Sequence, residues 1–234
     1  MLFSEIVDAI KNELQAYFLL GGITEDKQGS LTNAMAEGYV NEALVDLSAM
    51  GCINERRDLS TATYDSTLNQ SSLILPTDLA SIANVSYLVS GKLKPLTLIN
   101  NDLSMESAVS GTTPTAYYVL DEMSGAGVPQ KRLVITGNTG TYHIIADVYV
   151  IHPKMQITDT NQIMRIPVQY HISILNYAKS RALDLAASCM TDPQKSATAL
   201  QLSSKTLQLY LADKKKLHAD ALWYGKNDFV MRQQ

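Results

Sequence analysis

The chain has 234 residues, of which 46% are hydrophobic and 18% are charged, a balance typical of a globular rather than a disordered protein. No apolar run approaches the length that crosses a bilayer, and the N-terminus lacks the basic and apolar regions of a signal peptide. We therefore expect a soluble protein that stays where it is made. The formal charge of -4 argues against a protein that binds nucleic acid by neutralising phosphates.

Two amphipathic helices are predicted at the N-terminus. Apolar residues recur every three to four positions from Leu2 to Phe18, and Gly21-Gly22 would end this helix. A second helix is predicted from about Ser30, as its N-cap, to Gly51. We expect the two to pair as a helical hairpin within residues 1–60.

Residues 61–153 are predicted to form an antiparallel β-rich insertion, because Ser, Thr, Asn and Gly separate short β-branched and aromatic runs. Ser90-Gly91 and Gly137–Gly140 have tight-turn chemistry and should each join antiparallel neighbours. One short helix is predicted at Asn101–Ala108. The candidate strands are Leu73–Leu75, Ile82–Val89, Lys92–Thr97, Tyr117–Leu120, Leu133–Thr136 and Tyr142–Ile151.

Two further helices in residues 154–217 should complete the helical body. Pro167 opens the first of them, and an apolar stripe runs along it from Ile174 to Cys189. The predicted fold is therefore α+β, a four-helix body of two N-terminal and two C-terminal helices with an inserted β module and an extended C-terminal tail.

The fourth helix is predicted to begin at Asp192-Pro193, where Asp192 can cap it and Pro193 fits the first turn. We expect it to end at Lys214-Lys215-Lys216, which suits the negative end of a helix dipole. Residues 218–234 then form a C-terminal arm. The apolar face of this helix is predicted to comprise Ala197, Leu200, Ser204, Leu207 and Leu211.

The two cysteines, Cys52 and Cys189, follow helical apolar patterns. This placement suits buried thiols in a reducing compartment better than a disulfide framework. A single disulfide between them stays open as an alternative.

The sequence contains no recognisable catalytic, cofactor or metal motif. The four histidines, at 143, 152, 171 and 218, lack metal-ligand spacing, and we interpret His143 and Asp147 as a surface pair on one strand face. Phosphate-loop and nucleophile-elbow patterns are missing as well. Of Tyr117 and Tyr118, one should lie in the core and the other at the surface or an interface. We expect a protein that is not an enzyme and uses no cofactor or metal.

A series of short motifs lies in one order along nearly the whole chain. They are Leu75-Pro76-Thr77-Asp78-Leu79, Leu93–Leu96, Thr113–Tyr118, Leu133–Ile135, Thr139–Tyr142, Val148–Pro153, Ile166–His171, Asn176-Tyr177-Ala178 and Arg181-Ala182. With the predicted order of elements, this series resembles the adaptor proteins of tailed-bacteriophage head-to-tail connectors.

The resemblance implies a homo-oligomeric ring, commonly of twelve subunits, that docks on the portal protein and attaches tail or nozzle proteins. Double-stranded DNA would pass through its lumen without sequence-specific binding. The protein would be made in the host cytoplasm and would reside at the head-tail junction of the virion, without membrane contact.

The C-terminal arm is the candidate portal-binding segment. Its large side chains can fill pockets in a neighbouring chain, and its basic residues can form rim charge pairs that steer docking. The alternative is that the aromatic residues fold back onto the helices as ordinary packing. The candidate partner-binding residues are Trp223, Tyr224, Lys226, Phe229, Val230 and Arg232.

Three other functions compete with the portal adaptor. A tail-completion or neck protein, one layer further down, would share the ring and differ in its partner. A glycan-binding module or glycan hydrolase of a phage tail would need a carboxylate pair, but Asp121 and Glu122 are predicted in a loop and Asp147 within a strand. A DNA-binding regulator would need a basic recognition helix, whereas the third and fourth helices carry apolar stripes.

Overall fold

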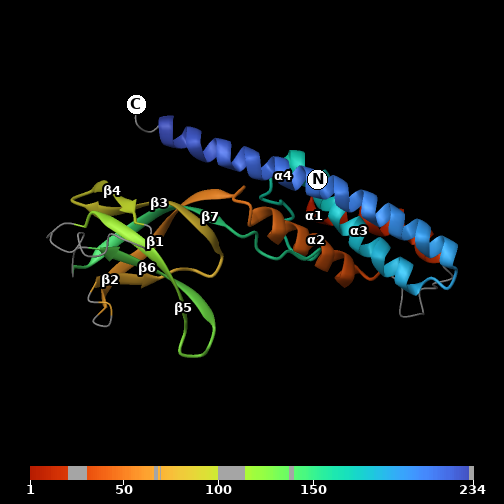
Figure 1. The fold of residues 1–234 in the computed structure, drawn as a ribbon, viewed down its shortest axis with the longest axis horizontal. Coiled ribbons are helices and arrows are strands. Elements are labelled where there is room, and N and C mark those ends of the chain that lie inside the picture. Colours follow the sequence, from red (N-terminus) through yellow and green to blue (C-terminus); the bar gives the residue numbers. More distant parts are fainter. Residues whose placement is uncertain (21–30, 66–67, 69, 100–113, 137–139, 232–234) are drawn as a thin grey trace. The chain divides into compact units, whose positions relative to one another are not determined.

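The computed structural model describes the whole chain except residues 21–30, 66–67, 69, 100–113, 137–139 and 232–234, and for residues 16–20 and 220–231 it describes the backbone alone. The described chain has four α-helices and seven β-strands in the order that the sequence predicted, which confirms the α+β class (Figure 1). It divides into two compact units: a helical unit, residues 1–53 with 151–234, and a barrel unit, residues 54–150.

The helical unit is built around its third helix, α3, against which the other three helices pack. A short 3-10 turn at Val168–Tyr170 leads into α3, just after the Pro167 that was predicted to open it. No helix in the described residues combines the length and the apolar character needed to cross a membrane. The helices are α1 (Phe3–Leu20), α2 (Asn33–Ser48), α3 (His171–Cys189) and α4 (Pro193–Met231).

Local capping signals set two of the helix starts. The Oγ1 atom of Thr32 accepts a first-turn N–H at 3.2 Å and is the N-cap of α2, so the prediction of Ser30, which lies outside the described residues, was wrong. The Oδ1 atom of Asp192 accepts the N–H of Gln194 at 2.9 Å, which confirms Asp192 as the cap of α4.

The fourth helix does not end at its lysine run. It continues through Lys214-Lys215-Lys216 to Met231, so the predicted helix end was wrong. Lysine is a good helix former, and basic residues are favourable near a helix C-terminus without forcing one. Residues 217–224, which follow the lysine run, include no glycine or proline that would break the helix.

The buried face of α4 also differs from the prediction. Ala199, Ser203, Tyr210 and Leu217 are at most 3% exposed, whereas the predicted stripe is exposed except for the half-buried Leu207. The Oγ atom of Ser203 lies 3.1 Å from the carbonyl oxygen of Ser180 on α3. A close helix contact made through small and hydroxyl side chains leaves Leu200 and Leu211 exposed, so the hydrophobic pattern alone predicted the wrong buried face.

The barrel unit is a closed seven-stranded barrel in the order β1-β2-β6-β5-β4-β3-β7. Its pairs are antiparallel except β4 with β5, which run parallel, so the predicted antiparallel module is mixed. The strands are β1 (Asn54–Asp65), β2 (Gln70–Ile74), β3 (Leu79–Val89), β4 (Lys92–Leu98), β5 (Ala116–Met123), β6 (Pro129–Thr136) and β7 (Tyr142–Val150).

Six of these strands were predicted with shifted ends, but β1 was not predicted. Its register against β7 shifts between Asp58 and Thr61, where Ser60 has a positive φ of 72°. A β-bulge of this kind moves the side-chain alternation by one residue, which removes the period-two signal that marks a strand in a sequence.

One predicted turn is confirmed and one is wrong. Ser90 and Gly91 have φ of 50° and 76° and join β3 to β4 as an antiparallel hairpin. By contrast, β6 and β7 are not neighbours, because β2 and β1 lie between them in the barrel. Residues 137–139 of this connection, and the predicted short helix at Asn101–Ala108, lie outside the described residues.

Both tyrosines at the start of β5 are buried, so the prediction that one of them lies at the surface or at an interface was wrong. Tyr117 is 2% and Tyr118 is 5% exposed. Tyr117 is paired with Ile135 and Tyr118 with Val134 on β6, and both partners are fully buried. Adjacent strand residues point to opposite faces, so both faces of the sheet are covered at this point.

The two cysteines are free thiols, and both are half-buried. Cys52 follows α2 rather than lying within a helix, and Cys189 is the last residue of α3. Burial raises the pKa of Cys52 to about 11, so this thiol is protonated and unreactive at neutral pH.

Candidate functional site

The carboxylate of Asp46 on α2 anchors the middle of α4. The Nζ atom of Lys214 lies 2.7 Å from both carboxylate oxygens, and the hydroxyl of Tyr210 donates to the same group. The ring of Tyr210 packs on that of Tyr177 from α3, with 4.9 Å between centroids. Burial and the neighbouring Asp46 carboxylate raise the pKa of Tyr210, so its hydroxyl remains a hydrogen-bond donor at neutral pH.

Beyond this anchor, α4 extends past the start of α3. Ser173, the third residue of α3, donates a hydrogen bond of 2.5 Å to Asp213 of the antiparallel α4. Leu217, one turn further along α4, is 3% exposed and is the last buried side chain that the structure describes in this helix. The helical segment 218–231 then continues for about 21 Å at 1.5 Å per residue (Figure 1).

This segment contains the residues predicted to bind the portal. The backbone of Trp223, Tyr224, Lys226, Phe229 and Val230 is helical, where the sequence predicted an extended tail. Arg232 lies outside the described residues. The contacts of these six residues with the portal remain a prediction.

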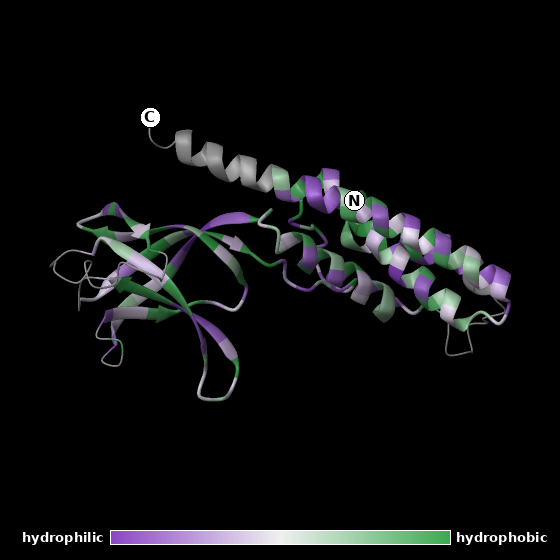
Figure 2. Ribbon diagram, in the orientation of Figure 1, coloured by the Kyte–Doolittle hydropathy of each residue, from purple (hydrophilic) through white to green (hydrophobic). Residues whose placement is uncertain are grey.

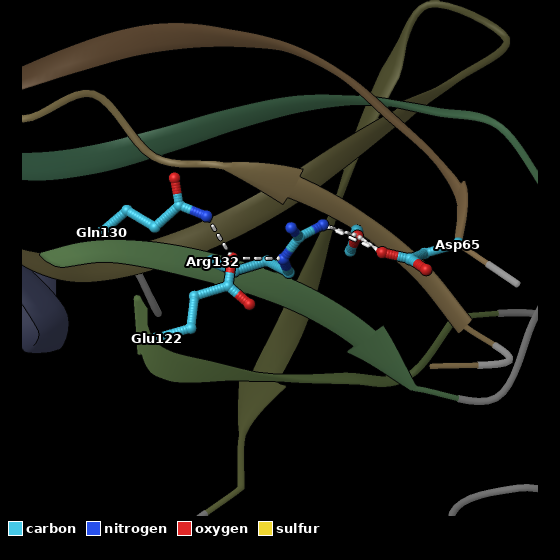
Figure 3. Close-up of polar contacts among 5 residues, drawn as sticks. Asp65, Glu122, Gln130 and Arg132 are labelled. Carbon is cyan, nitrogen blue, oxygen red and sulfur yellow. Dashed lines mark hydrogen bonds and ion pairs between the residues drawn. The ribbon is translucent and has the colours of Figure 1, made fainter. Parts of the chain in front are cut away.

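On the barrel unit, the guanidinium of Arg132 on β6 links two strands (Figure 3). Its Nη1 atom lies 2.9 Å from Asp65 at the end of β1, and its Nε atom lies 2.8 Å from Glu122 on β5. Gln130 donates to the same Glu122 oxygen at 2.6 Å. These side chains are 20–29% exposed where they form ion pairs, so the cluster is partly shielded from water. Sequence spacing offers no signal for it, because the three charges come from three strands.

Replacing Arg132 by glutamine should lower the free energy of unfolding by about 1 kcal/mol, since Asp65 and Glu122 would lose their shared counter-charge. Urea unfolding of the purified variant measures this loss. Lys131→Gln, which changes an exposed lysine at the adjacent position, is the matched control and should leave stability within about 0.5 kcal/mol. Equal effects of the two substitutions would refute a stabilising role for the cluster.

The carboxylates considered for glycan chemistry do not converge. Asp121 and Glu122 lie on β5 rather than in a loop, and Glu122 is held by Arg132. Asp147 lies on β7, which β4 and β3 separate from β5, and the Nε atom of Arg56 donates to it at 2.9 Å. The arrangement therefore gives no support to a glycosidase carboxylate pair.

His143 and Asp147 share a face of β7 but pair with different residues. The Nε2 atom of His143 lies 2.8 Å from the carboxylate of Asp58, whereas Asp147 binds Arg56. Within the described ranges, no group of three or more His, Cys, Asp or Glu side chains is placed to hold a metal ion.

The barrel unit has a cavity of about 440 Å³ between the β2–β3 connection and the β5–β6 hairpin, which was not predicted from the sequence. Leu75 and Leu79 form part of its wall, and Met123 at the end of β5 is 66% exposed beside it. The motif Leu75–Leu79, which contributed to the family resemblance, lines this cavity. Its largely apolar wall can take up an apolar side chain of another protein.

The comparison with protein families defines the class of protein first. Residues 1–225, which include both units and most of α4, match a model of adaptor proteins, which are structural proteins of phage virions. The matching model is that of the SU10 adaptor protein, and the chain belongs to this family of phage head-tail adaptors. This result confirms the predicted resemblance. A search of curated proteins finds no match.

Proposed function

We propose that the chain forms a ring, of twelve subunits, that docks on the portal protein at the head-tail junction of the virion and attaches the tail. Its lumen then serves as the conduit through which double-stranded DNA leaves the head, without sequence-specific contacts. The observation that carries this proposal is the match to the adaptor family over residues 1–225. The net charge of -4 is compatible with DNA that slides past rather than binds.

The C-terminal arm, residues 218–234, is the portal-binding element in this proposal. Support comes from α4, which is fixed to α2 and α3 as far as Leu217 and continues as a helix beyond it. Trp223, Lys226 and Val230 are three and four residues apart, a spacing that repeats along one side of a helix. A large aromatic side chain such as that of Trp223 often contributes much of the binding energy of an interface.

Deleting residues 218–234 should abolish portal binding and leave the rest of the protein folded. The deletion removes the aromatic anchors but none of the polar contacts that hold α4 at Asp46 and Ser173. Native mass spectrometry of each protein mixed with the purified portal of the same phage measures binding. Circular dichroism and thermal unfolding report on the remaining fold.

A truncation after Met231 is the matched control. It removes Arg232 but keeps the helix and its aromatic residues, so it should bind with a slower association rate and nearly unchanged affinity, because rim charges steer docking more than they strengthen it. Portal binding by the 218–234 deletion would refute the arm as the binding element. Binding of the full chain to tail proteins but not to portal would favour a neck protein instead.

A further inference from the structure

The outer side of α4 carries leucine side chains that no described part of the subunit covers. Leu200 is 48% and Leu211 is 45% exposed, and Leu207 between them is half-buried. Positions 200, 207 and 211 are seven and four residues apart, so they lie on one side of the helix. We call these three residues the leucine stripe. It spans about 17 Å of helix at 1.5 Å per residue, and Figure 2 shows hydrophobic residues among hydrophilic ones along α4.

Polar contacts on the adjoining, buried side of α4 prevent the helix from turning its leucine stripe inward. The hydroxyl of Ser203 lies between the Ser180 carbonyl and the Asp184 carboxylate on α3. Further along the helix, Lys214 is held by Asp46. A rotation that buried the leucine stripe would break these bonds and leave polar groups without partners, which is costly. The exposure of the stripe is therefore built into the fold of the subunit.

The exposed side of α4 is basic. Lys205, Lys215 and Lys216 are exposed, and Asp213, the one acidic residue between positions 193 and 219, is bonded to Ser173. Two copies that met through this surface alone would bring lysines together. The charge pattern therefore disfavours a symmetric pairing of leucine stripes and favours a partner with an acidic surface.

The helical unit itself offers such a surface on α1. The side of α1 that faces away from its buried residues carries the exposed acids Glu5 and Asp8, and Glu13 further along is 53% exposed in its pair with Lys179. At the start of this helix the apolar side chains of Met1 and Leu2 are 44% and 42% exposed. We call this the α1 face.

Both α1 and α4 pack on α3 rather than extensively on each other, so the leucine stripe and the α1 face belong to different parts of the helical unit. We infer that the leucine stripe of one subunit docks on the α1 face of a second copy of this chain, with lysines of α4 opposite acids of α1. Two different, complementary surfaces on one subunit make a head-to-tail contact, which closes as a ring when the rotation allows. The inference rests on the proposed ring and names the contact that builds it.

The double substitution Leu200→Gln with Leu211→Gln tests the contact in the full-length chain. Self-association should weaken at least tenfold, measured by sedimentation velocity of the chain alone and by native mass spectrometry with the portal protein of the same phage. Leu209→Gln is the matched control, because Leu209 is 50% exposed at the opposite edge of the exposed side of α4 and should not matter. Unchanged circular dichroism and thermal unfolding must accompany each variant.

A charge exchange tests the orientation. Lys215→Glu alone and Asp8→Lys alone should each weaken assembly, and their combination should restore it at least in part. If the wild type assembles and the double leucine variant assembles equally well, the leucine contact is refuted but the proposed ring is not. A wild-type chain that stays monomeric even with portal would overturn the ring and the contact together, and a symmetric dimer lost on leucine substitution would overturn the head-to-tail arrangement.

Discussion

Replacing Ile144 by alanine should lower the free energy of unfolding by about 2 to 5 kcal/mol, the usual cost of truncating a fully buried isoleucine. Ile144 is 0% exposed and lies on β7, which pairs with β1 on one side and β3 on the other. It is paired with Tyr87, whose ring packs edge-on against Tyr142 at 5.6 Å. The cavity left by the substitution would lie where three strands meet, so neighbouring side chains cannot easily fill it.

Ile145→Ala is the matched control for this prediction. The same substitution one position later removes the same groups from the opposite face of β7, where the side chain is only half-buried. It changes strand propensity equally and should cost about 1 kcal/mol. Urea unfolding of both variants gives the comparison, and similar losses would contradict the inward orientation of Ile144.

The stability of the protein should fall as the pH is lowered from 7 to 5, because two buried histidines are held neutral in the folded state. His152 is 3% exposed, with Nδ1 2.6 Å from the Pro153 carbonyl oxygen and Nε2 accepting the N–H of Arg165 at 3.0 Å. His171 is 5% exposed, with Nε2 3.0 Å from the Ile166 carbonyl oxygen. In each ring the hydrogen bonds fix one neutral tautomer.

Burial, opposed by the carbonyl hydrogen bond and reinforced by a nearby positive charge, lowers the pKa of both histidines. In the unfolded chain a histidine has a pKa of about 6.5. Below that pH the histidines bind protons in the unfolded state but remain neutral in the folded state, so stability present at pH 7 is lost as the pH falls. The loss is at most about 1.4 kcal/mol per pH unit for each histidine.

Urea unfolding at pH 7, 6 and 5 measures this dependence. His152→Gln and His171→Gln should each flatten the slope between pH 7 and 5, whatever their effect at pH 7. His218→Gln changes an exposed histidine and should leave the slope unchanged. A slope that survives both substitutions of buried histidines would assign the pH dependence to other groups.

The packing of α3 on α4 explains how this helix pair can be stable and still leave apolar side chains exposed. Alanine, serine and tyrosine side chains occupy the buried line of α4, and their hydroxyls find acceptors on α2 and α3. Leu217 is also buried, but Leu200, Leu209 and Leu211 remain exposed. In the proposed ring, these exposed apolar side chains are available for contact with a neighbouring subunit.

Local chemistry was enough to predict much of this protein. The cap at Asp192, the turn at Ser90-Gly91 and the apolar stripe of α3 follow from rules that involve a few neighbouring residues. The structure confirms the cap, the turn and the part of the stripe from Ile174 to Ala182. The order of short motifs along the chain was also enough to indicate the adaptor family.

Only the tertiary structure decided which elements meet. In the barrel, β1 and β2 lie between β6 and β7, and the start of β5 is buried on both faces. Arg132 forms ion pairs with acidic residues of two other strands. The buried face of α4 was decided in the same way, by hydrogen bonds to α2 and α3 rather than by its own hydrophobic pattern. Contacts between residues far apart in the chain depend on strand order and helix rotation, and the periodicity of a single segment carries no information about either.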